Sequence, residues 1–342
     1  MEPVLAGQGV YGCTFIPAPR CAGGKVFSQI HGLPAVGKIT IEKTDDELRI
    51  GKAIMSLPLA ELYFALPTES CEPAPLPAAV TKECDVMKEN PSAKLTMMIM
   101  PDGGITVDEY MHDPARCMKN MKAILIHLLE GGIIYQNAGY VHNDIHPGNI
   151  LVDKLNVARY IDFGLGFRIA DVKRWSDANM GRIFKSKYLW TAPEIHALRM
   201  RPSGYDIEKG IAELREHAEY RLIETMFGTN ALADLEAVVN RTGQTEVDQT
   251  NFLKEYGKKI DCWRIGLLMI SIWKEMLHVT PFTFKFSEIY KDQAVRDVMK
   301  GLTRFDPKER WSFSHALRHL APKSPVLPPE AVANEPKANE PK

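Results

Sequence analysis

The sequence predicts an α+β protein of two lobes, a small β-rich lobe followed by a larger helical lobe. Residues 1–104 are rich in glycine, proline and short apolar segments, whereas residues 105–320 carry longer helical patterns. The chain has 342 residues, which is long enough for two substantial lobes. With 45% hydrophobic and 25% charged residues, its composition is that of an ordinary globular protein.

The small lobe begins with a glycine-rich segment in which Gly7, Gly9 and Gly12 follow the spacing Gly-x-Gly-x-x-Gly. Such glycines let a hairpin bring backbone N–H groups close to phosphates without a Cβ in the way. The same spacing also marks dinucleotide-binding folds, but those need a strand before and a helix after it. Only six residues precede Gly7, and residues 14–17 read as an extended segment that ends at proline. We therefore expect a glycine-rich cover over nucleotide phosphates.

Residues 35–41 read as the next strand and contain Lys38. A lysine at this place can contact nucleotide phosphates if a carboxylate on a following helix fixes its position. Glu47 is the preferred partner, with Glu61 as the alternative. Lys25 competes with Lys38, but the two glycines before it indicate a turn. The alternative for Lys38 is an exposed strand lysine without a ligand.

Residues 94–100 form an apolar run that ends in Pro-Asp-Gly-Gly, which indicates a buried strand leaving the small lobe through a hinge. The adenine of a nucleotide is expected to lie against this strand, held by backbone groups between Met98 and Pro101. Met98 and Met100 are the candidate contacts, since Pro101 has no N–H to donate. A core strand without a ligand is the alternative.

Three further segments complete the outline of the chain. Residues 118–134 place apolar side chains three and four positions apart, which predicts an amphipathic helix. Residues 207–227 show the same helical spacing. Residues 321–342 are rich in proline and poor in apolar side chains, so we expect a disordered tail.

The most informative stretch is residues 142–149, His-Asn-Asp-Ile-His-Pro-Gly-Asn, which Asp-Phe-Gly follows at residues 162–164. Asp144 is the candidate base for the proton of an attacking hydroxyl. Asn149 and Asp162 are the candidate oxygen ligands of Mg²⁺, which would hold the phosphates of ATP. The apolar residues between them predict a short hairpin that presents both at one end. A turn rich in Asn and Asp explains either cluster alone, but not both at this spacing.

These motifs together resemble the eukaryotic-type protein kinases over residues 5–320. The matching segments follow the order of that family: the glycine-rich segment, Lys38, residues 142–149, 162–164, 192–194 and 261–266, and Arg310. Residues 11–21 also resemble the serine/threonine kinases encoded by large nucleocytoplasmic DNA viruses. The resemblance implies a bilobal kinase fold that phosphorylates serine or threonine of protein substrates with ATP and Mg²⁺. It also implies that Glu194 and Arg310 form a buried ion pair and that Asp261 braces the catalytic loop.

The chain departs from the family pattern at several positions. Asn143 stands where the family usually has arginine, which argues against control by a clamped phosphate on the activation segment. His146 replaces the lysine beside the transferred phosphate and is counted here as a catalytic residue with Asp144, Lys38 and Glu47. Lys187, next to Ser186, replaces a threonine. Residues 195–260 form an insert that either caps the large lobe or docks a partner.

Two other functions compete with protein phosphorylation. The pattern His-x-Asp-x-His-Pro-x-Asn at residues 142–149 also resembles small-molecule phosphotransferases of the aminoglycoside and choline kinase type. A pseudokinase scaffold with little turnover is the other alternative, because Asn143 and His146 depart from the family. Lys38, Asp144 and the two metal ligands argue against a pseudokinase.

Charge and cysteine content bear on the binding partners and the cellular compartment of the protein. The net charge of −1 gives no surplus for sequence-independent nucleic-acid binding. The six cysteines are scattered without a Cys-x-x-Cys pair, which predicts reduced thiols. The first residues lack a basic segment followed by a long apolar one, and no apolar run is long enough for a membrane span. We therefore expect a cytoplasmic protein that does not bind membranes, in the host cytoplasm or the virion if the protein is viral.

Overall fold

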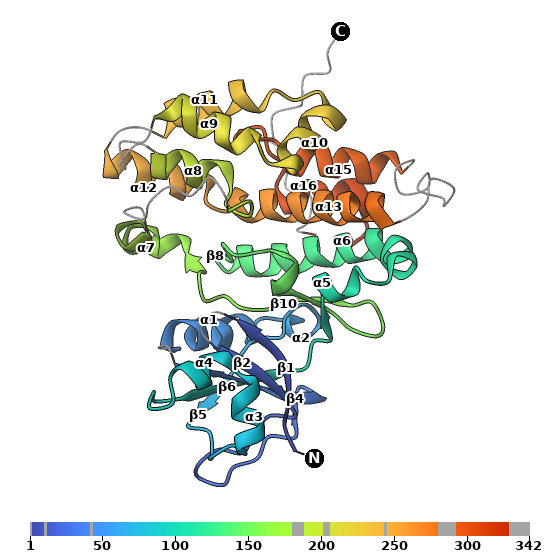
Figure 1. Cartoon of the computed structure of the whole chain (residues 1–342). Helices are drawn as coiled ribbons and strands as arrows, with labels where there is room; N and C mark the ends of the chain where they lie inside the picture. Colours follow the sequence, from blue (N-terminus) through green and yellow to red (C-terminus); the bar gives the residue numbers. More distant parts are fainter. Residues whose placement is uncertain are drawn as a thin grey trace.

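The computed structural model describes residues 2–9, 12–41, 44–179, 188–200, 206–242, 245–279 and 292–327 (Figure 1). The small lobe holds an antiparallel sheet in the order β1-β2-β4-β6-β5, and a short β3 pairs with β4. Its strands are β1 (Val4–Gly9), β2 (Gly12–Ile16), β3 (Gln29–Ile30), β4 (Leu33–Thr40), β5 (Glu69–Cys71) and β6 (Thr96–Pro101). The sheet is followed by a helical lobe, so the α+β prediction is correct.

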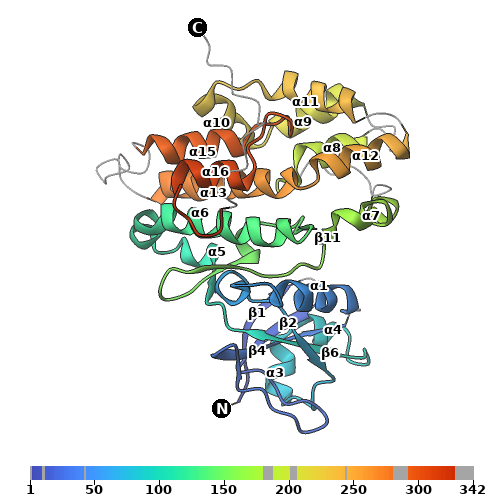
Figure 2. The ribbon, with the colours of Figure 1, turned by 180° about the vertical axis from the view of Figure 1, so that it is seen from behind.

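Helices on both sides of the sheet complete the small lobe. Figure 1 shows α1 (Asp45–Met55) and α2 (Ala60–Tyr63) between the sheet and the large lobe, and Figure 2 shows α1 there from behind. The short helices α3 (Ala78–Glu83) and α4 (Asp85–Glu89) pack elsewhere on the sheet, where Val80 and Val86 join its buried core.

The large lobe is built around α6 (Pro114–Asn137), whose start is set by local sequence. Asp113 caps the helix by accepting a hydrogen bond from the Arg116 N–H at 3.1 Å, and Pro114 occupies the first turn, where its missing N–H costs nothing. The predicted apolar stripe is buried, with each side chain at most 3% exposed: Met121, Ile124, Leu125, Leu128 and Leu129. This confirms the predicted helix and places its stripe in the main core.

The remaining elements of the large lobe surround α6 and α13 (Lys259–Val279). The short strands are β7 (Ile105–Thr106), β8 (Tyr140–Val141), β9 (Ile150–Val152), β10 (Ala158–Tyr160) and β11 (Phe167–Arg168). The other helices are α5 (Val107–Tyr110), α7 (Val172–Asn179), α8 (Pro193–Met200), α15 (Gln293–Leu302) and α16 (Phe313–Leu320), with 3₁₀ turns η1 (Pro147–Asn149) and η2 (Ile169–Asp171).

The insert folds into helices that cover the large lobe. They are α9 (Ile207–Arg215), α10 (Ala218–Phe227), α11 (Ala231–Arg241) and α12 (Glu246–Tyr256). The helical segment predicted at residues 207–227 is therefore two helices, broken at Glu216 and His217. Its apolar side chains are used inside the lobe: Ile211, Leu214, Tyr220 and Ile223 are fully buried. The apolar face of this segment thus caps the lobe and is not open to a partner.

The first residues of the predicted disordered tail are ordered. Residues 321–327 lie against the large lobe, where Val326 and Leu327 pack on the main core. The Ser324 hydroxyl donates a hydrogen bond to Glu130 on α6 at 2.7 Å. Proline richness therefore does not make this part disordered, because a few apolar side chains find a surface to cover. The rest of the predicted tail lies outside the described residues.

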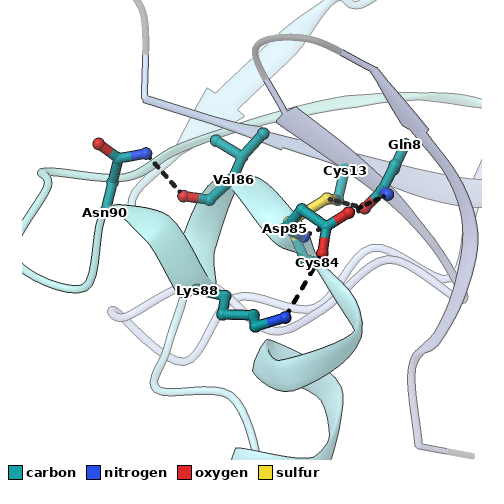
Figure 3. The surroundings of a disulfide bond; sticks show 7 residues. All are labelled: Gln8, Cys13, Cys84, Asp85, Val86, Lys88 and Asn90. Carbon is teal, nitrogen blue, oxygen red and sulfur yellow. Dashed lines mark hydrogen bonds and ion pairs between the residues drawn. A yellow bond between two sulfur atoms is a disulfide. The ribbon is translucent and has the colours of Figure 1, made fainter.

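Two disulfides in the small lobe contradict the prediction of reduced thiols. Cys13 on β2 bonds to Cys84 before α4 (Figure 3), and Cys21 bonds to Cys71 on β5. The pairs are 71 and 50 residues apart in sequence, so the sheet, not local spacing, brings them together. The argument from cysteines for a reducing compartment is thereby lost. Among the described helices, none is long and apolar enough to cross a membrane.

Removing the inner disulfide tests how much the pairs stabilise the small lobe. We expect the double substitution Cys21→Ala and Cys71→Ala to lower the free energy of unfolding by about 2–3 kcal/mol. The denatured chain gains entropy when a loop opens, and the outer disulfide limits this gain because it still closes the chain around it. Urea denaturation measures the difference. Under a strong thiol reductant the wild type and the variant should unfold at nearly the same urea concentration; a difference that persists would assign the loss to packing.

Candidate active site

Asp261 on α13 holds the backbone of the predicted catalytic loop, residues 142–149. One carboxylate oxygen of Asp261 accepts the His142 N–H and the other accepts the Asn143 N–H, both at 2.8 Å. The Tyr135 hydroxyl donates to the same carboxylate at 2.9 Å. Asp261 is fully buried, so these hydrogen bonds replace the water that the charge has lost. The structure thus places Asp261 in the bracing position that the resemblance implies.

Asn143 has a left-handed backbone, with φ of 59°. Asparagine tolerates this region better than most residues because its short amide bonds locally. Its side-chain N–H donates to the Leu165 carbonyl at 3.2 Å, which ties the catalytic loop to the segment after Asp162. The residue that departs from the family pattern is therefore well suited to this backbone.

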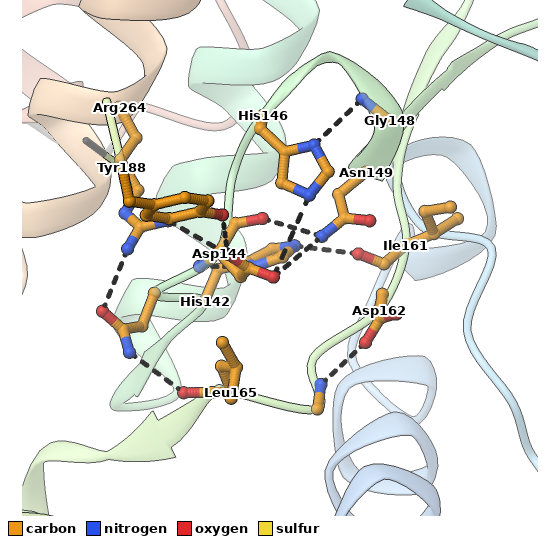
Figure 4. A network of polar contacts seen from close by, with 12 residues as sticks. His142, Asp144, His146, Gly148, Asn149, Ile161, Asp162, Leu165, Tyr188 and Arg264 are labelled. Atoms are coloured by element: carbon orange, nitrogen blue, oxygen red, sulfur yellow. Dashed lines mark hydrogen bonds and ion pairs between the residues drawn. The ribbon is translucent and has the colours of Figure 1, made fainter. Parts of the chain in front are cut away.

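Asp144 and Asn149 face each other across the turn at η1. The Asn149 amide N–H donates to the Asp144 carbonyl at 2.9 Å and to its carboxylate at 3.3 Å. Both bonds use the nitrogen, so the amide oxygen of Asn149 is turned away from Asp144 (Figure 4). That oxygen remains available for a cation.

The β9–β10 hairpin brings Asn149 close to Asp162, as the sequence predicts. The strands pair antiparallel, and the Ile161 N–H donates to the Asn149 carbonyl at 3.1 Å. Asp162 has φ of 59° and accepts the Gly164 N–H at 3.1 Å. Phe163 is fully buried, with its ring 4.2 Å from that of His142. The buried ring anchors the loop and so holds the carboxylate before it.

Lys38 links the two lobes through two carboxylates. Its ammonium lies 3.0 Å from Glu47 on α1 and 2.9 Å from Asp162. The structure therefore pairs Lys38 with Glu47 and not with Glu61. Burial alone lowers the pKa of Lys38, but Asp162 and Glu47 outweigh it and raise the pKa above its usual value. Lys25, the rival lysine, forms an exposed pair with Glu69 instead.

The three glycines of the first hairpin have different reasons to be glycine. A Cβ on Gly12 would lie 2.2 Å from the Ile39 carbonyl, so Gly12 lets β2 pack on β4. A Cβ on Gly7 or Gly9 would meet nothing within 4 Å. Those two glycines are therefore not required by packing, which agrees with a role toward a ligand. Residues 10 and 11 lie outside the described residues.

Met98 and Met100 are the predicted adenine contacts, but their backbone N–H and C=O groups point toward β4. Alternate residues of a strand direct their backbone groups to opposite edges. Asp102 donates its N–H to the Pro34 carbonyl beside β4, and the register makes Met100 and Met98 face β4 in the same way. Both side chains are also buried. The direction of these backbone groups follows from the strand register, which the apolar run in the sequence does not reveal.

The other backbone groups of β6 point away from β4, toward the edge where a ligand could bind. The Ile99 carbonyl accepts the Thr68 N–H at 3.2 Å, and β5 ends at this point. Beyond the end of β5, the Pro101 carbonyl and the Gly103 amide point to this same edge, away from β4. These two groups are the candidate hinge contacts for adenine.

His146 lies beside Asp144, with its Nε2 4.0 Å from the carboxylate. Its Nδ1 accepts the Gly148 N–H at 3.1 Å, which assigns the ring proton to Nε2. Burial lowers the pKa of His146, although the carboxylates of Asp144 and Asp108 oppose the shift. The imidazole is therefore neutral at pH 7 before nucleotide binds.

Two residues that touch Asp144 were not predicted from the sequence. Tyr188 donates its hydroxyl to Asp144 at 3.3 Å, and Arg264 on α13 donates to the same oxygen at 3.3 Å. Neither belongs to a local motif, and they lie 44 and 120 residues from Asp144. Lys187, which departs from the family pattern in the sequence, and the adjacent Ser186 lie outside the described residues.

The donor set fits magnesium. Asn149 offers an amide oxygen and Asp162 a carboxylate at the same end of one hairpin, and hard oxygen ligands are what Mg²⁺ prefers. Among the described residues, no group of three or more His, Cys, Asp or Glu side chains could hold a metal.

The buried histidine behind the site predicts a pH effect on stability. Burial, with smaller contributions from the nearby Arg199, His217 and Arg264 side chains, lowers the pKa of His196 to about 3. Below pH 6.5 the unfolded chain then binds a proton that the folded chain excludes, so the free energy of unfolding falls as pH drops. Between pH 7.5 and 5 we expect a loss of about 2 kcal/mol from this group.

Urea denaturation of the wild type and of His196→Gln at both pH values checks this expectation. The variant is less stable at pH 7.5 because a buried side chain has changed, but it should lose about 2 kcal/mol less on acidification. Equal losses in the two proteins would show that His196 does not carry the pH dependence.

Comparison with known proteins agrees with this geometry. Residues 86–186 match the ABC1 atypical kinase-like domain. The matched segment is less than a third of the chain, and it includes the hinge, the catalytic loop and Asp162 but not Lys38 or Glu47. No curated protein matches the chain, so the finer resemblance to viral serine/threonine kinases gains no support. This segment of the chain is thus similar to an atypical kinase-like domain.

Proposed function

We propose that this protein transfers the γ-phosphoryl group of ATP, bound with Mg²⁺, to serine or threonine hydroxyls of protein substrates. The observation that carries the proposal is the meeting of four separate segments at one place. Lys38 and Glu47 from the small lobe meet Asp162, and the same hairpin holds Asn149 against Asp144. Phosphoryl transfer needs this combination of positioned cation, metal ligands and base.

Each residue has a distinct part in the proposed reaction. Lys38, held by Glu47, would orient the phosphates of ATP, and Asn149 and Asp162 would hold Mg²⁺, whose charge would offset that of the phosphates. Asp144 accepts the proton as the substrate oxygen bonds to the γ-phosphorus. The bond from that phosphorus to the bridging oxygen breaks, and ADP leaves.

The nucleotide is placed by the hinge and the first hairpin. Adenine lies at the outward edge of β6, where the Pro101 carbonyl accepts and the Gly103 amide donates. Gly7 and Gly9 let the β1–β2 hairpin approach the phosphates. His146, neutral before binding, offers its Nε2 proton to the transferred group.

A second candidate is a small-molecule phosphotransferase. The His-Pro pair at residues 146–147, part of the pattern that resembles such enzymes, favours it. The Glu194–Arg310 ion pair beneath the segment before α8 favours a protein acceptor, because in the family that the sequence resembles this pair supports the substrate-binding segment. We therefore rank protein substrates first.

Radiolabelled ATP with Mg²⁺ tests the proposal. We expect label on mixed protein acceptors, with phosphoserine and phosphothreonine after acid hydrolysis. Label on amino sugars or choline-like alcohols alone would replace the leading function with the second. If no ADP formed with either class of acceptor, both functions would be refuted.

Asp144→Asn supplies the matched control. It keeps the shape of the side chain but removes the base, so we expect turnover to fall by about a hundredfold or more while ATP still binds. Nucleotide binding is followed with a fluorescent ATP analogue. Full turnover in a folded Asp144→Asn protein would show that Asp144 is not the base.

A further inference from the structure

The catalytic carboxylate has an unusual partner on the side away from the metal ligands. Arg264 reaches from α13 and donates to Oδ1 of Asp144 at 3.3 Å. The second nitrogen of its guanidinium lies 3.5 Å from the Asn143 side-chain oxygen. Figure 4 shows Arg264 on one side of Asp144 and Asn149 with Asp162 on the other. The two oxygens of the carboxylate thus meet different surroundings.

Arg264 is built into the core and is not a surface side chain that happens to reach the loop. It is 3% exposed, and its Nε is buried without a hydrogen-bond partner among the described residues. Asp144 is the one acidic side chain of the described segments within ion-pair distance of it. A buried guanidinium is costly unless it is paired, so this cation depends on Asp144 for compensation.

The same helix supplies both supports of the loop. Asp261 and Arg264 are three residues apart on α13, a spacing that places them on one face. Asp261 accepts the backbone N–H groups of the loop, while Arg264 donates to its catalytic side chain. One helical turn therefore fixes the backbone with an anion and the carboxylate with a cation.

The identity of residue 143 fits this arrangement. An arginine at this position, as in the family that the sequence resembles, would bring a second guanidinium toward Arg264. Asn143 is neutral, and its side-chain oxygen accepts a hydrogen bond from Arg264. Its side-chain N–H donates a hydrogen bond to the Leu165 carbonyl. A neutral residue 143 and a basic residue 264 are thus complementary.

We propose that Arg264 is the positioning residue of the catalytic base, a role that rests on the proposed phosphoryl transfer. It holds Oδ1 of Asp144 and thereby turns Oδ2 toward Asn149, where the substrate hydroxyl arrives. Tyr188 also donates to Oδ1, but Tyr188 is exposed, so the buried contact to this oxygen comes from Arg264. The cation of the catalytic loop is supplied by α13 and needs no phosphate on the activation segment.

Substitutions of Arg264 test this role through turnover. Arg264→Met removes the charge and keeps much of the volume, and we expect kcat to fall by about tenfold to a hundredfold. The KM for ATP should change less than about twofold, because Arg264 contacts no predicted nucleotide residue. Arg264→Lys keeps a cation and should recover part of the loss. Wild-type kcat in Arg264→Met would overturn the proposal.

A double-mutant cycle with Asp144→Asn separates positioning from stability. If Arg264 acts through the carboxylate, then Arg264→Met in the Asp144→Asn background should leave the single-turnover rate unchanged within about twofold. A further loss equal to that of the single substitution would overturn the proposal and assign a structural role. This comparison remains decisive if Arg264→Met lowers the melting temperature, because each rate is measured well below it.

Lys274→Met is the matched control on the same helix. Lys274 pairs with Glu219 at 2.6 Å and does not touch the catalytic loop. We expect wild-type kcat from this variant, so a general effect of losing a cation from α13 is excluded. A comparable loss of kcat in Lys274→Met would count against the proposal. Absence of transfer in the wild type would refute the proposed function itself.

Discussion

Asp162→Ala is expected to reduce phosphoryl transfer by at least about a thousandfold, the largest effect of any single substitution considered. Mg²⁺ would lose its carboxylate ligand, and Lys38 would lose one of its two anionic partners. The fold should survive because Lys38 keeps Glu47 at 3.0 Å and Phe163 stays buried. Transfer of label from ATP, followed over hours with excess enzyme, measures the remaining rate.

Asp177→Ala is the control for this experiment. Asp177 is an exposed acidic residue on α7 that pairs with Lys173 at 3.2 Å, so its loss removes a carboxylate without touching the site. We expect wild-type transfer from it. If Asp162→Ala kept more than about a tenth of the wild-type rate, Asp162 could not be the metal ligand that the reaction requires.

Glu194→Ala should lower the free energy of unfolding by about 3–5 kcal/mol. Glu194 and Arg310 are joined by two hydrogen bonds, at 2.7 and 2.9 Å, and both side chains are fully buried. Removing the carboxylate leaves a buried guanidinium without its counter-charge. Chemical denaturation monitored by tryptophan fluorescence measures the loss.

An exposed ion pair provides the comparison for this second prediction. Lys173→Ala removes one partner of the pair on α7, where both side chains are largely exposed. Water and salt screen such pairs, so we expect a change within about 0.5 kcal/mol. A loss below about 1 kcal/mol in Glu194→Ala would mean that the lobe repacks around Arg310.

The sequence predicted the features that local chemistry determines. The stripe of α6 follows from helical spacing, and the hairpin between Asn149 and Asp162 follows from two apolar runs around a turn. The preference for Glu47 over Glu61 as the partner of Lys38 also agrees with the structure. In each case the residues that specify the feature lie within one or two neighbouring elements.

Features that depend on long-range geometry were missed. The pairing of Cys13 with Cys84 requires the finished sheet, and the outward direction of the Pro101 carbonyl requires the register between β4 and β6. The contact of Arg264 with Asp144 requires α13 to pass beneath the catalytic loop. None of these distances is encoded in a short motif, so periodicity and motif spacing cannot reveal them.

The two disulfides give the lobes different dependences on their surroundings. Both lie between Cys13 and Cys84 in the small lobe, while Cys117 and Cys262 of the large lobe are buried thiols. Protein disulfides exchange with the thiols around them, and for such a two-electron couple each 30 mV of potential corresponds to about 1.4 kcal/mol. The redox poise of the medium therefore acts on the small lobe, which holds both disulfides, whereas the two buried thiols of the large lobe form no disulfide that it could reduce.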